Sequence, residues 1–421
     1  MRPAIPRGFR DVLPREARER THIAQAMLDV MSAWGYGAVE TPVAEEYAVL
    51  QAGVGKSLEG TAFPFFDADG QLLALRPEMT VPIARLAATR LRDKLAPHRL
   101  CYHSDVFREH ASLRGQPRQF TQVGLELIGG KTPAGDAEII AVLVEALRAT
   151  GLSGFIVRVG TVEALEALIR VSGKDEPWRQ AVLGAAQSRN LVAIDALAGA
   201  QDVSAQVRTA LVTLPRIRGD RRSLKSAREV AGFCDGVSDA LESLEATWEL
   251  LEAAGVDDAV SIDFGTMRSF GYYTGMVLEV FAPQLGVAIG GGGRYDSLMS
   301  EFDSPMPAAG FAVGIERVHI ALSQQDRLPQ AEDVDAVLGG EASHAFAAAR
   351  QLRESGMRVR QSLRAGEELV AEAAAFGAKQ VLLATGEGLY RLDEKGSPQE
   401  PFDIGQSLFS QRPASTGGKV T

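Results

Sequence analysis

A chain of 421 residues is long enough for two or three domains, and 46% hydrophobic with 23% charged residues is typical of a globular protein. A net charge of −10 argues against a generic nucleic-acid binder, whose affinity comes from Lys and Arg, although a local basic patch is compatible with that average. Residues 1–10 lack the apolar run of a secretion signal, and no apolar stretch of about 18 residues occurs. The two cysteines, Cys101 and Cys234, are far apart, so we expect a cytoplasmic protein without membrane spans, disulfides or a metal site.

The first 160 residues predict a mixture of helices and strands. Apolar residues at helical spacing indicate the helices, and alternating apolar residues indicate the strands. In chain order we expect a helix at 14–33, a strand at 39–42, a helix at 76–90, strands at 99–108 and 119–128 joined by a polar loop at 109–118, a helix at 136–150 and a strand at 155–159. The two long strands are expected to pair antiparallel and to hold the loop on a rigid frame.

The pattern changes after about residue 160. Successive helical patterns with little strand signal indicate a helical insertion, after which strand patterns return at 260–264, 276–280 and 287–289, and residues 308–322 run from a strand into a helix. A polar linker at 323–333 precedes a shorter alternation of strands and helices. We therefore expect a core from residues 1–160 and 255–325, an insertion at 161–254, a small α/β domain at 334–410 and a loose tail at 411–421.

Two glycine-rich segments could bring the backbone close to a ligand. Residues 53–57 resemble a phosphate loop, but Leu50 stands where its first glycine is required, so no phosphate cradle is expected there. The four glycines at 290–293, followed by Arg294, Tyr295 and Asp296, leave backbone exposed at a strand end, where a ligand can approach. A plain tight bend is the alternative.

Polar side chains share one face in two predicted elements. Glu78 and Thr80 are two residues apart, and Gln122 and Glu126 are four apart in a predicted strand. Two carboxylates, an amide and a hydroxyl could bind an α-ammonium group and a polar side chain, although a solvated face is the alternative. Four arginines could bind anionic groups through their planar forks, although each alone fits an ordinary surface residue: Arg108, Arg118, Arg268 and Arg317.

Several segments occur in the order found in histidyl-tRNA synthetases. They are residues 7–11, 35–42, 76–80, 107–108, 119–129, 272–275, 291–298 and 310–318. The resemblance covers roughly residues 5–325 and, more weakly, the C-terminal segment, which resembles a shortened anticodon-binding domain. It implies an α+β fold, in which the antiparallel sheet of class II aminoacyl-tRNA synthetases is flanked by helices, and a dimer formed through the Pro42 region.

The resemblance also places a histidine pocket on this chain. A carboxylate and a phenol can satisfy the two ring nitrogens of histidine, and buried partners left unpaired would penalise ligands without them. The resemblance implies that Glu78, Thr80 and Gln122 bind the α-ammonium group of histidine. It implies that Glu126 and Tyr273, with Tyr272 adjacent, bind the imidazole. All six are of the type that the family's pattern requires.

The nucleotide side departs from the synthetase pattern. The family's Phe-Arg-x-Glu signature ends here in His110, where a glutamate that contacts adenine is expected. Gln116 stands in place of a loop arginine, Thr121 in place of a histidine and Gly271 in place of an aspartate. Adenylate formation depends on charge positioned at the transition state, so it would suffer, whereas the remaining arginines could still hold an anion.

This chain has the histidine-pocket residues of the synthetases but an altered nucleotide site. In this combination it resembles the regulatory subunits of ATP phosphoribosyltransferase, which are paralogues of the synthetase. That resemblance implies a protein without catalytic residues that assembles with a short-form catalytic subunit, is needed for its full activity and mediates feedback inhibition by L-histidine in the first step of histidine biosynthesis. We expect a homodimer within a hetero-oligomer such as a hetero-octamer, with no cofactor and no tRNA. The alternatives are a divergent synthetase that activates histidine with ATP and a free-standing histidine-binding module.

Overall fold

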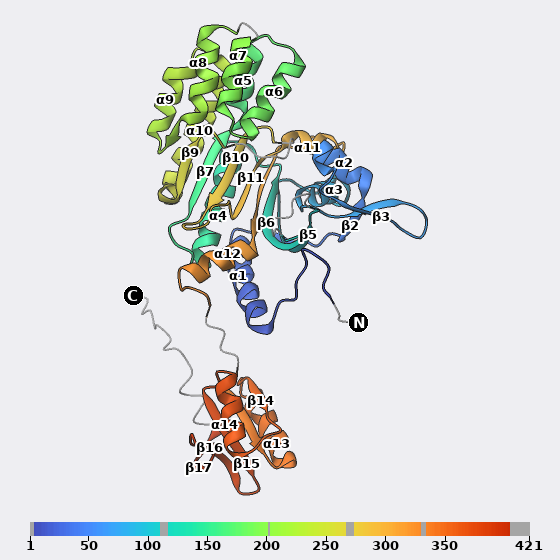
Figure 1. The fold of residues 1–421 in the computed structure, drawn as a ribbon, viewed down its shortest axis with the longest axis vertical. Helices are drawn as coiled ribbons and strands as arrows, with labels where there is room; N and C mark the ends of the chain where they lie inside the picture. Colours follow the sequence, from blue (N-terminus) through green and yellow to red (C-terminus); the bar gives the residue numbers. More distant parts are fainter. Residues whose placement is uncertain (1–3, 110–116, 201–202, 267–272, 330–333, 405–421) are drawn as a thin grey trace. The chain divides into compact units, whose positions relative to one another are not determined.

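The computed structural model describes residues 4–109, 117–200, 203–266, 273–329 and 334–404. The chain divides into two compact units, Met1–Pro329 and Gln330–Thr421 (Figure 1). The tail expected at 411–421 lies outside the described residues. Among the described residues, no helix is both long and apolar enough to cross a membrane.

A large sheet forms the centre of the first unit. Strand β1 runs parallel to β5 and β7 runs parallel to β9, whereas the other neighbours pair antiparallel. Within the described residues, its strands lie in the order β1 (Gly37–Ala38), β5 (His98–Phe107), β6 (Gln119–Ile128), β12 (Ala308–Gly314), β11 (Gly290–Arg294), β10 (Met276–Phe281), β7 (Ile156–Thr161), β9 (Val260–Asp263) and β8 (Arg218–Gly219). The predicted antiparallel pair at 99–108 and 119–128 is confirmed with nearly the expected bounds.

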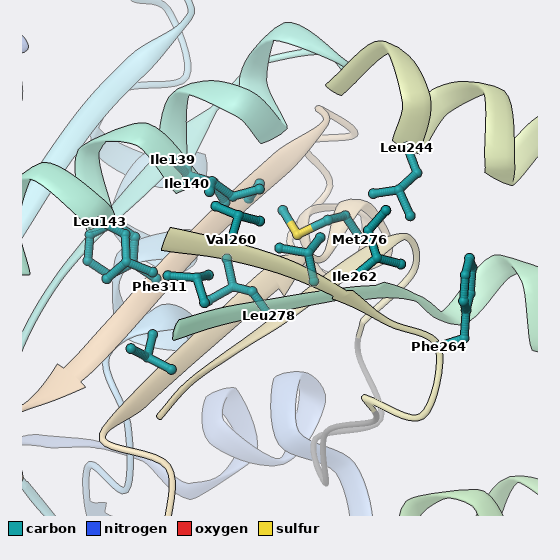
Figure 2. Packing of buried hydrophobic residues seen from close by; sticks show 14 of the residues in the cluster. Ile139, Ile140, Leu143, Leu244, Val260, Ile262, Phe264, Met276, Leu278 and Phe311 are labelled. Atoms are coloured by element: carbon teal, nitrogen blue, oxygen red, sulfur yellow. The ribbon is translucent and has the colours of Figure 1, made fainter. Parts of the chain in front are cut away.

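Helices cover both faces of this sheet, because successive side chains of its central strands point to opposite faces and apolar side chains occur on both. On β6, Val123, Leu125 and Leu127 join a hydrophobic cluster with α1 (Pro14–Ala33), α4 (Ala134–Ala149) and α12 (Ile315–Gln324). Figure 2 shows Ile139, Ile140 and Leu143 of α4 packed beside Phe311 of β12. The other face packs against α2 (Tyr47–Val54), α3 (Thr80–Arg90) and α11 (Asp296–Ser300). A small sheet beside these helices consists of β2 (Ala44–Glu46), β4 (Leu72–Leu75) and β3 (Phe63–Phe66).

Residues 162–254 are mainly helical, as the pattern predicts. Trp178, Val182 and Trp248 of this segment belong to the same hydrophobic cluster as the face of the sheet that α4 covers, so the segment shares a core with the sheet. It also supplies the edge strand β8. Its helices are α5 (Val162–Val171), α6 (Glu176–Gln187), α7 (Leu191–Ala200), α8 (Ala205–Thr213), α9 (Arg222–Ala231) and α10 (Asp235–Ala254), with short 3-10 turns at η2 (Leu214–Arg216) and η3 (Asp257–Ala259).

Two predicted elements near the pocket begin elsewhere. The helix expected from residue 76 begins at Thr80, because Arg76 turns its guanidinium to the backbone oxygen of Thr41, 2.7 Å away, and Glu78 caps the helix. The strand predicted at 39–42 is observed at residues 37–38, where β1 pairs with β5, and the backbone N–H of Val39 donates to the backbone oxygen of Cys101.

The strand expected at 287–289 is also wrong, because the glycine run 290–293 itself forms β11. A methyl group on Gly292 would collide with the backbone oxygen of Gly310 on the neighbouring strand. Close approach of two strands therefore outweighs the low strand propensity of glycine.

The second unit is a small α/β fold with its own hydrophobic clusters. Its strands β13, β14 and β15 pair in parallel, and two further antiparallel strands extend the sheet. The elements are β13 (Ala336–Gly340), α13 (Ala342–Glu354), β14 (Val359–Gln361), α14 (Gly366–Ala375), β15 (Gln380–Thr385), β16 (Gly388–Leu392) and β17 (Pro398–Pro401). The last two strands were not predicted: β16 is short, with its leucines only partly buried, and β17 is exposed throughout.

Candidate functional site

The floor of the candidate site is the face of β6 that carries Gln122, Gly124 and Glu126. These residues alternate with the buried Val123 and Leu125, so they share one face, as predicted. Opposite Glu126 in the register stands Gly310 of β12, and a methyl group there would collide with the Glu126 carboxylate. The glycine thus makes the space in which the carboxylate lies.

Glu126 is a buried carboxylate with two hydroxyl donors. Its side chain is 1% exposed and accepts hydrogen bonds from Thr80 Oγ1 at 2.9 Å and from Tyr295 Oη. Burial raises the pKa of Glu126 to about 8, although the hydrogen bonds from Tyr295 and Thr80 oppose that rise, and the nearby Glu78 adds to it. A group in this setting gains from a partner that donates hydrogen bonds or carries positive charge.

Glu78 links the site to the start of α3. Its carboxylate accepts the backbone N–H groups of Thr80 and Val81, both at 2.8 Å, and so caps the helix. This capping fixes the position of Thr80, whose hydroxyl reaches Glu126. Burial raises the pKa of Glu78 as well.

Two buried polar atoms face the same pocket without partners. Gln122 Oε1 and Tyr102 Oη have no hydrogen-bond partner among the described residues. Leaving such groups unpaired costs about 1 to 3 kcal/mol each, so a polar ligand would relieve them. The pocket is narrow, with about 30 Å³ of free space, and its lining consists of Glu78, Met79, Thr80, Tyr102, Arg108, Gln122, Tyr273, Gly291, Gly292, Tyr295, Gly310, Phe311 and Ala312.

A wider cleft of about 270 Å³ adjoins this pocket and shares Arg108 and Gln122 with it. Arg108 donates from Nε to the backbone oxygen of Pro77 at 2.7 Å and lies over the ring of Phe120. Arg317 lines the cleft and donates to the backbone oxygen of Ala288. Two carboxylates, those of Glu279 and Glu316, line it too, so the cleft carries both signs of charge.

The structure brings most of the predicted site residues together. Glu78, Thr80, Gln122 and Tyr273 line the pocket, and Glu126 lies beneath it, bonded to Tyr295, which also lines it. Tyr272 and Arg268, together with His110, Gln116 and Gly271, lie outside the described residues.

Arg118 lies away from this group. It forms an ion pair with Glu109 and packs against Gly8 and Phe63, and it lines neither the pocket nor the cleft. Arg118 therefore pairs with a neighbouring carboxylate and does not contribute to the pocket. Within the described part of the chain, no three His, Cys, Asp or Glu side chains gather as a metal site would require.

Two tyrosines in the pocket are not among the site residues that the sequence predicts. Tyr102 stands opposite Gly124 in the register of β5 and β6, so its phenol reaches over the glycine into the pocket. Tyr295 directly follows the glycine run and donates to Glu126. The alternation of β5 places Tyr102 on the same face as the buried Leu100, which is the signal that could have found it.

Comparisons with known proteins identify the family and the fold. The family model for histidyl-tRNA synthetase matches residues 8–318. The solved structure described as an ATP phosphoribosyltransferase regulatory subunit/histidyl-tRNA synthetase from Bacillus halodurans C is 31% identical, covers 92% of this chain and 99% of that chain, and gives a TM-score of 0.82. A histidyl-tRNA synthetase from Nostoc sp. PCC 7120, with a TM-score of 0.80 at 20% identity, covers 97% of this chain and 99% of its own and shares the fold.

Two relatives define the branch of the family more narrowly. The ATP phosphoribosyltransferase regulatory subunit of Moorella thermoacetica is 38% identical over 375 residues, which cover 89% of this chain and 96% of that protein. The regulatory subunit of Symbiobacterium thermophilum is 39% identical over 388 residues, which cover 90% and 96%. The chain therefore belongs to the regulatory subunits of ATP phosphoribosyltransferase, on the fold of the histidyl-tRNA synthetases.

Proposed function

We propose that the pocket over β6 binds L-histidine and that its occupancy regulates a catalytic ATP phosphoribosyltransferase subunit. The observation that carries the proposal is the pair of buried, unpartnered atoms, Gln122 Oε1 and Tyr102 Oη, beside the buried carboxylate of Glu126. An amino acid with an imidazole side chain brings donors at both ends of such a pocket.

The proposed contacts follow the polarity of the pocket. Glu78, Thr80 and Gln122 receive the α-ammonium group, which carries three N–H donors. Glu126 and Tyr273 receive the imidazole, and the Glu126 carboxylate accepts a ring N–H. Support comes from the common face of Gln122 and Glu126 and from the Thr80–Glu126 hydrogen bond of 2.9 Å, which joins the two ends.

Regulation requires that histidine bind one state of the assembly more tightly than another, because equal affinity would not change the equilibrium between the two states. The relatives' names point to a catalytic ATP phosphoribosyltransferase subunit as the partner. We infer that this chain forms a homodimer within a hetero-oligomer such as a hetero-octamer. Feedback inhibition then appears as a loss of transferase activity when histidine is added to the complex, but not to the catalytic subunit alone.

Histidine binding is tested by calorimetry on the full chain with Glu126→Ala. The alanine removes the buried acceptor, so we expect histidine affinity to fall at least about tenfold, because a hydrogen bond to a charged group contributes about 1.5 to 3 kcal/mol. Glu301→Ala, at an exposed position outside the pocket lining, is the control and should bind as the unaltered chain does. Equal affinity in both variants would show that the pocket is not the histidine site.

We also infer that this subunit does not charge tRNA and has no catalytic residues of its own. Support comes from relatives named regulatory subunits over nine-tenths of the chain and from the replacements at His110, Gln116 and Gly271. The test is histidine-dependent exchange between ATP and pyrophosphate, which should stay at background. Robust exchange would instead identify a divergent synthetase, and failure to recover a transferase by co-purification would favour a free-standing histidine-binding module.

A further inference from the structure

A second cavity, of about 450 Å³, lies where the helical insertion meets the sheet. Its walls come from the turn between α6 and α7, the segment from η2 to β8, strand β7 and the end of β9. None of its lining residues lines the histidine pocket or the adjoining cleft. The cavity therefore has its own lining, which one ion pair, Arg189 with Glu279, joins to the lining of the cleft.

The register of the edge strands gathers charged side chains on one face. Arg218 of β8 stands opposite Asp263 of β9, and Arg158 of β7 stands opposite Ser261, two residues before Asp263. Residues opposite one another, or two apart, share a face of a sheet. Arg158, Arg218 and Asp263 thus face the cavity together, and each of them lines it.

Positive charge dominates this lining. Four arginines line the cavity against the single carboxylate of Asp263, although the whole chain carries a net charge of −10. Arg158 lies 3.5 Å from Asp263 and stacks over a phenylalanine ring, and Arg189 pairs with Glu279 at 2.7 Å. Arg216 and Arg218 line the cavity and take part in no hydrogen bond or ion pair between described side chains, although the Asp195 carboxylate interacts electrostatically with Arg216. Their guanidinium groups can therefore turn toward a ligand.

Arg189 occupies a position that normally favours glycine. It follows the C-cap of α6 with a φ of 54°, in the left-handed region. Helices commonly end on a glycine there, because a side chain strains the backbone. The arginine brings a guanidinium into the cavity lining at this strained position, and such strain is often found where a side chain has a function.

We propose that this cavity binds a small phosphorylated metabolite that carries at least two negative charges. The planar forks of Arg216 and Arg218, with Arg158 and Arg189 beside them, suit phosphate oxygens. Leu191, Pro215 and Phe264 form an apolar wall for the carbon part of the ligand. Figure 2 shows Phe264 apart from Ile139 and Leu143, at the far end of the packed side chains. The volume lies within the range of about 300 to 1,000 Å³ common for small-molecule sites.

Pyrophosphate is the probe, titrated by calorimetry into the full chain at low ionic strength. We expect saturable binding that weakens as NaCl is raised, because the contacts are charged. The double variant Arg216→Ala with Arg218→Ala should lose at least about tenfold in affinity, since two charged contacts are removed. Both residues are exposed, and histidine binding by the double variant checks that it folds.

Two single variants locate the site. Arg222→Ala removes a nearby exposed arginine that pairs with Asp220 and does not line the cavity. The affinity of this variant for pyrophosphate should match that of the unaltered chain. Arg317→Ala removes a lining arginine of the cleft beside the histidine pocket and should also leave pyrophosphate affinity unchanged. Loss of binding in Arg317→Ala, undiminished binding in the double variant, no binding at millimolar pyrophosphate, or binding of an RNA oligonucleotide without pyrophosphate binding would each overturn the proposal.

Discussion

At the scale of single residues, the pocket depends on Glu126, a carboxyl group whose pKa is raised by burial. Glu126 has a pKa of about 8 because it is removed from water, and its two hydroxyl donors only partly offset that loss. A folded chain with this carboxylate therefore binds a proton that the unfolded chain releases above its ordinary pKa of 4.5. The free energy of unfolding must fall as pH rises between those two values.

This linkage predicts a pH-dependent difference between the unaltered chain and Glu126→Gln. Below pH 4.5 both forms are neutral at this position, and the difference in unfolding free energy is constant. From pH 5 to 8 the unaltered chain should lose up to about 1.4 kcal/mol per pH unit relative to the glutamine variant. Denaturant unfolding at pH 5, 6, 7 and 8 measures this difference, and a constant gap across the series would contradict the raised pKa.

The glycine opposite Glu126 predicts a second residue-scale effect. A methyl group in Gly310→Ala has no room beside the Glu126 carboxylate and a backbone oxygen, so the carboxylate must move and histidine affinity should fall at least about tenfold. Gly184→Ala, in the exposed face of α6 with open space around it, is the matched control. It should keep histidine affinity and stabilise the chain by about 0.5 to 1 kcal/mol.

At the scale of elements, one buried ion pair ties the glycine strand to the helix that covers the sheet. Arg294 of β11 contacts Asp136 of α4 at 2.6 Å, and both side chains are less than 6% exposed. Arg294 also donates to the backbone oxygen of Gly130 and to Asp296. Positions 290–293 of β11 are glycines and have no side chains to pack. This ion pair therefore links β11 to α4.

Breaking that pair should cost far more than breaking an exposed one. Asp136→Asn leaves a buried guanidinium with only the exposed carboxylate of Asp296 as a counter-charge, so we expect a loss of about 3 kcal/mol in unfolding free energy. Asp258→Asn breaks the exposed pair with Arg148 and should cost under about 1 kcal/mol. Equal losses in the two variants, measured by urea unfolding, would mean that Arg294 finds other partners.

At the scale of the whole molecule, the site and the second cavity both belong to the first unit. The second unit has its own hydrophobic clusters, formed by residues after 333. We therefore expect a chain that ends at residue 329 to fold and to bind histidine with the affinity of the full chain. Calorimetry and circular dichroism on the shortened chain test this, and a loss of histidine binding with an intact helical signal would show that the second unit contributes to the pocket.

The sequence by itself determined the order of elements and most of the pocket. The alternation of β6 places Gln122 and Glu126 on one face, and periodicity alone predicts α1, α4 and α12, because both depend on local repeats. The helices α2 and α11 on the other face of the sheet were not predicted. The identity of the pocket residues came from ordered motifs, and Glu78, Thr80, Gln122, Glu126 and Tyr273 do gather in space. What these residues bind remains a proposal.

Only the tertiary structure decided the features that depend on distant segments. Gly290–Arg294 forms a strand because its neighbour lies too close for side chains, which no local propensity encodes. Tyr102 lines the pocket because it lies opposite Gly124 on the neighbouring strand. Arg118 lies outside the pocket, where it forms an ion pair with Glu109. The basic cavity likewise joins four arginines from separate segments, since register and packing, and not sequence spacing, set which charges meet.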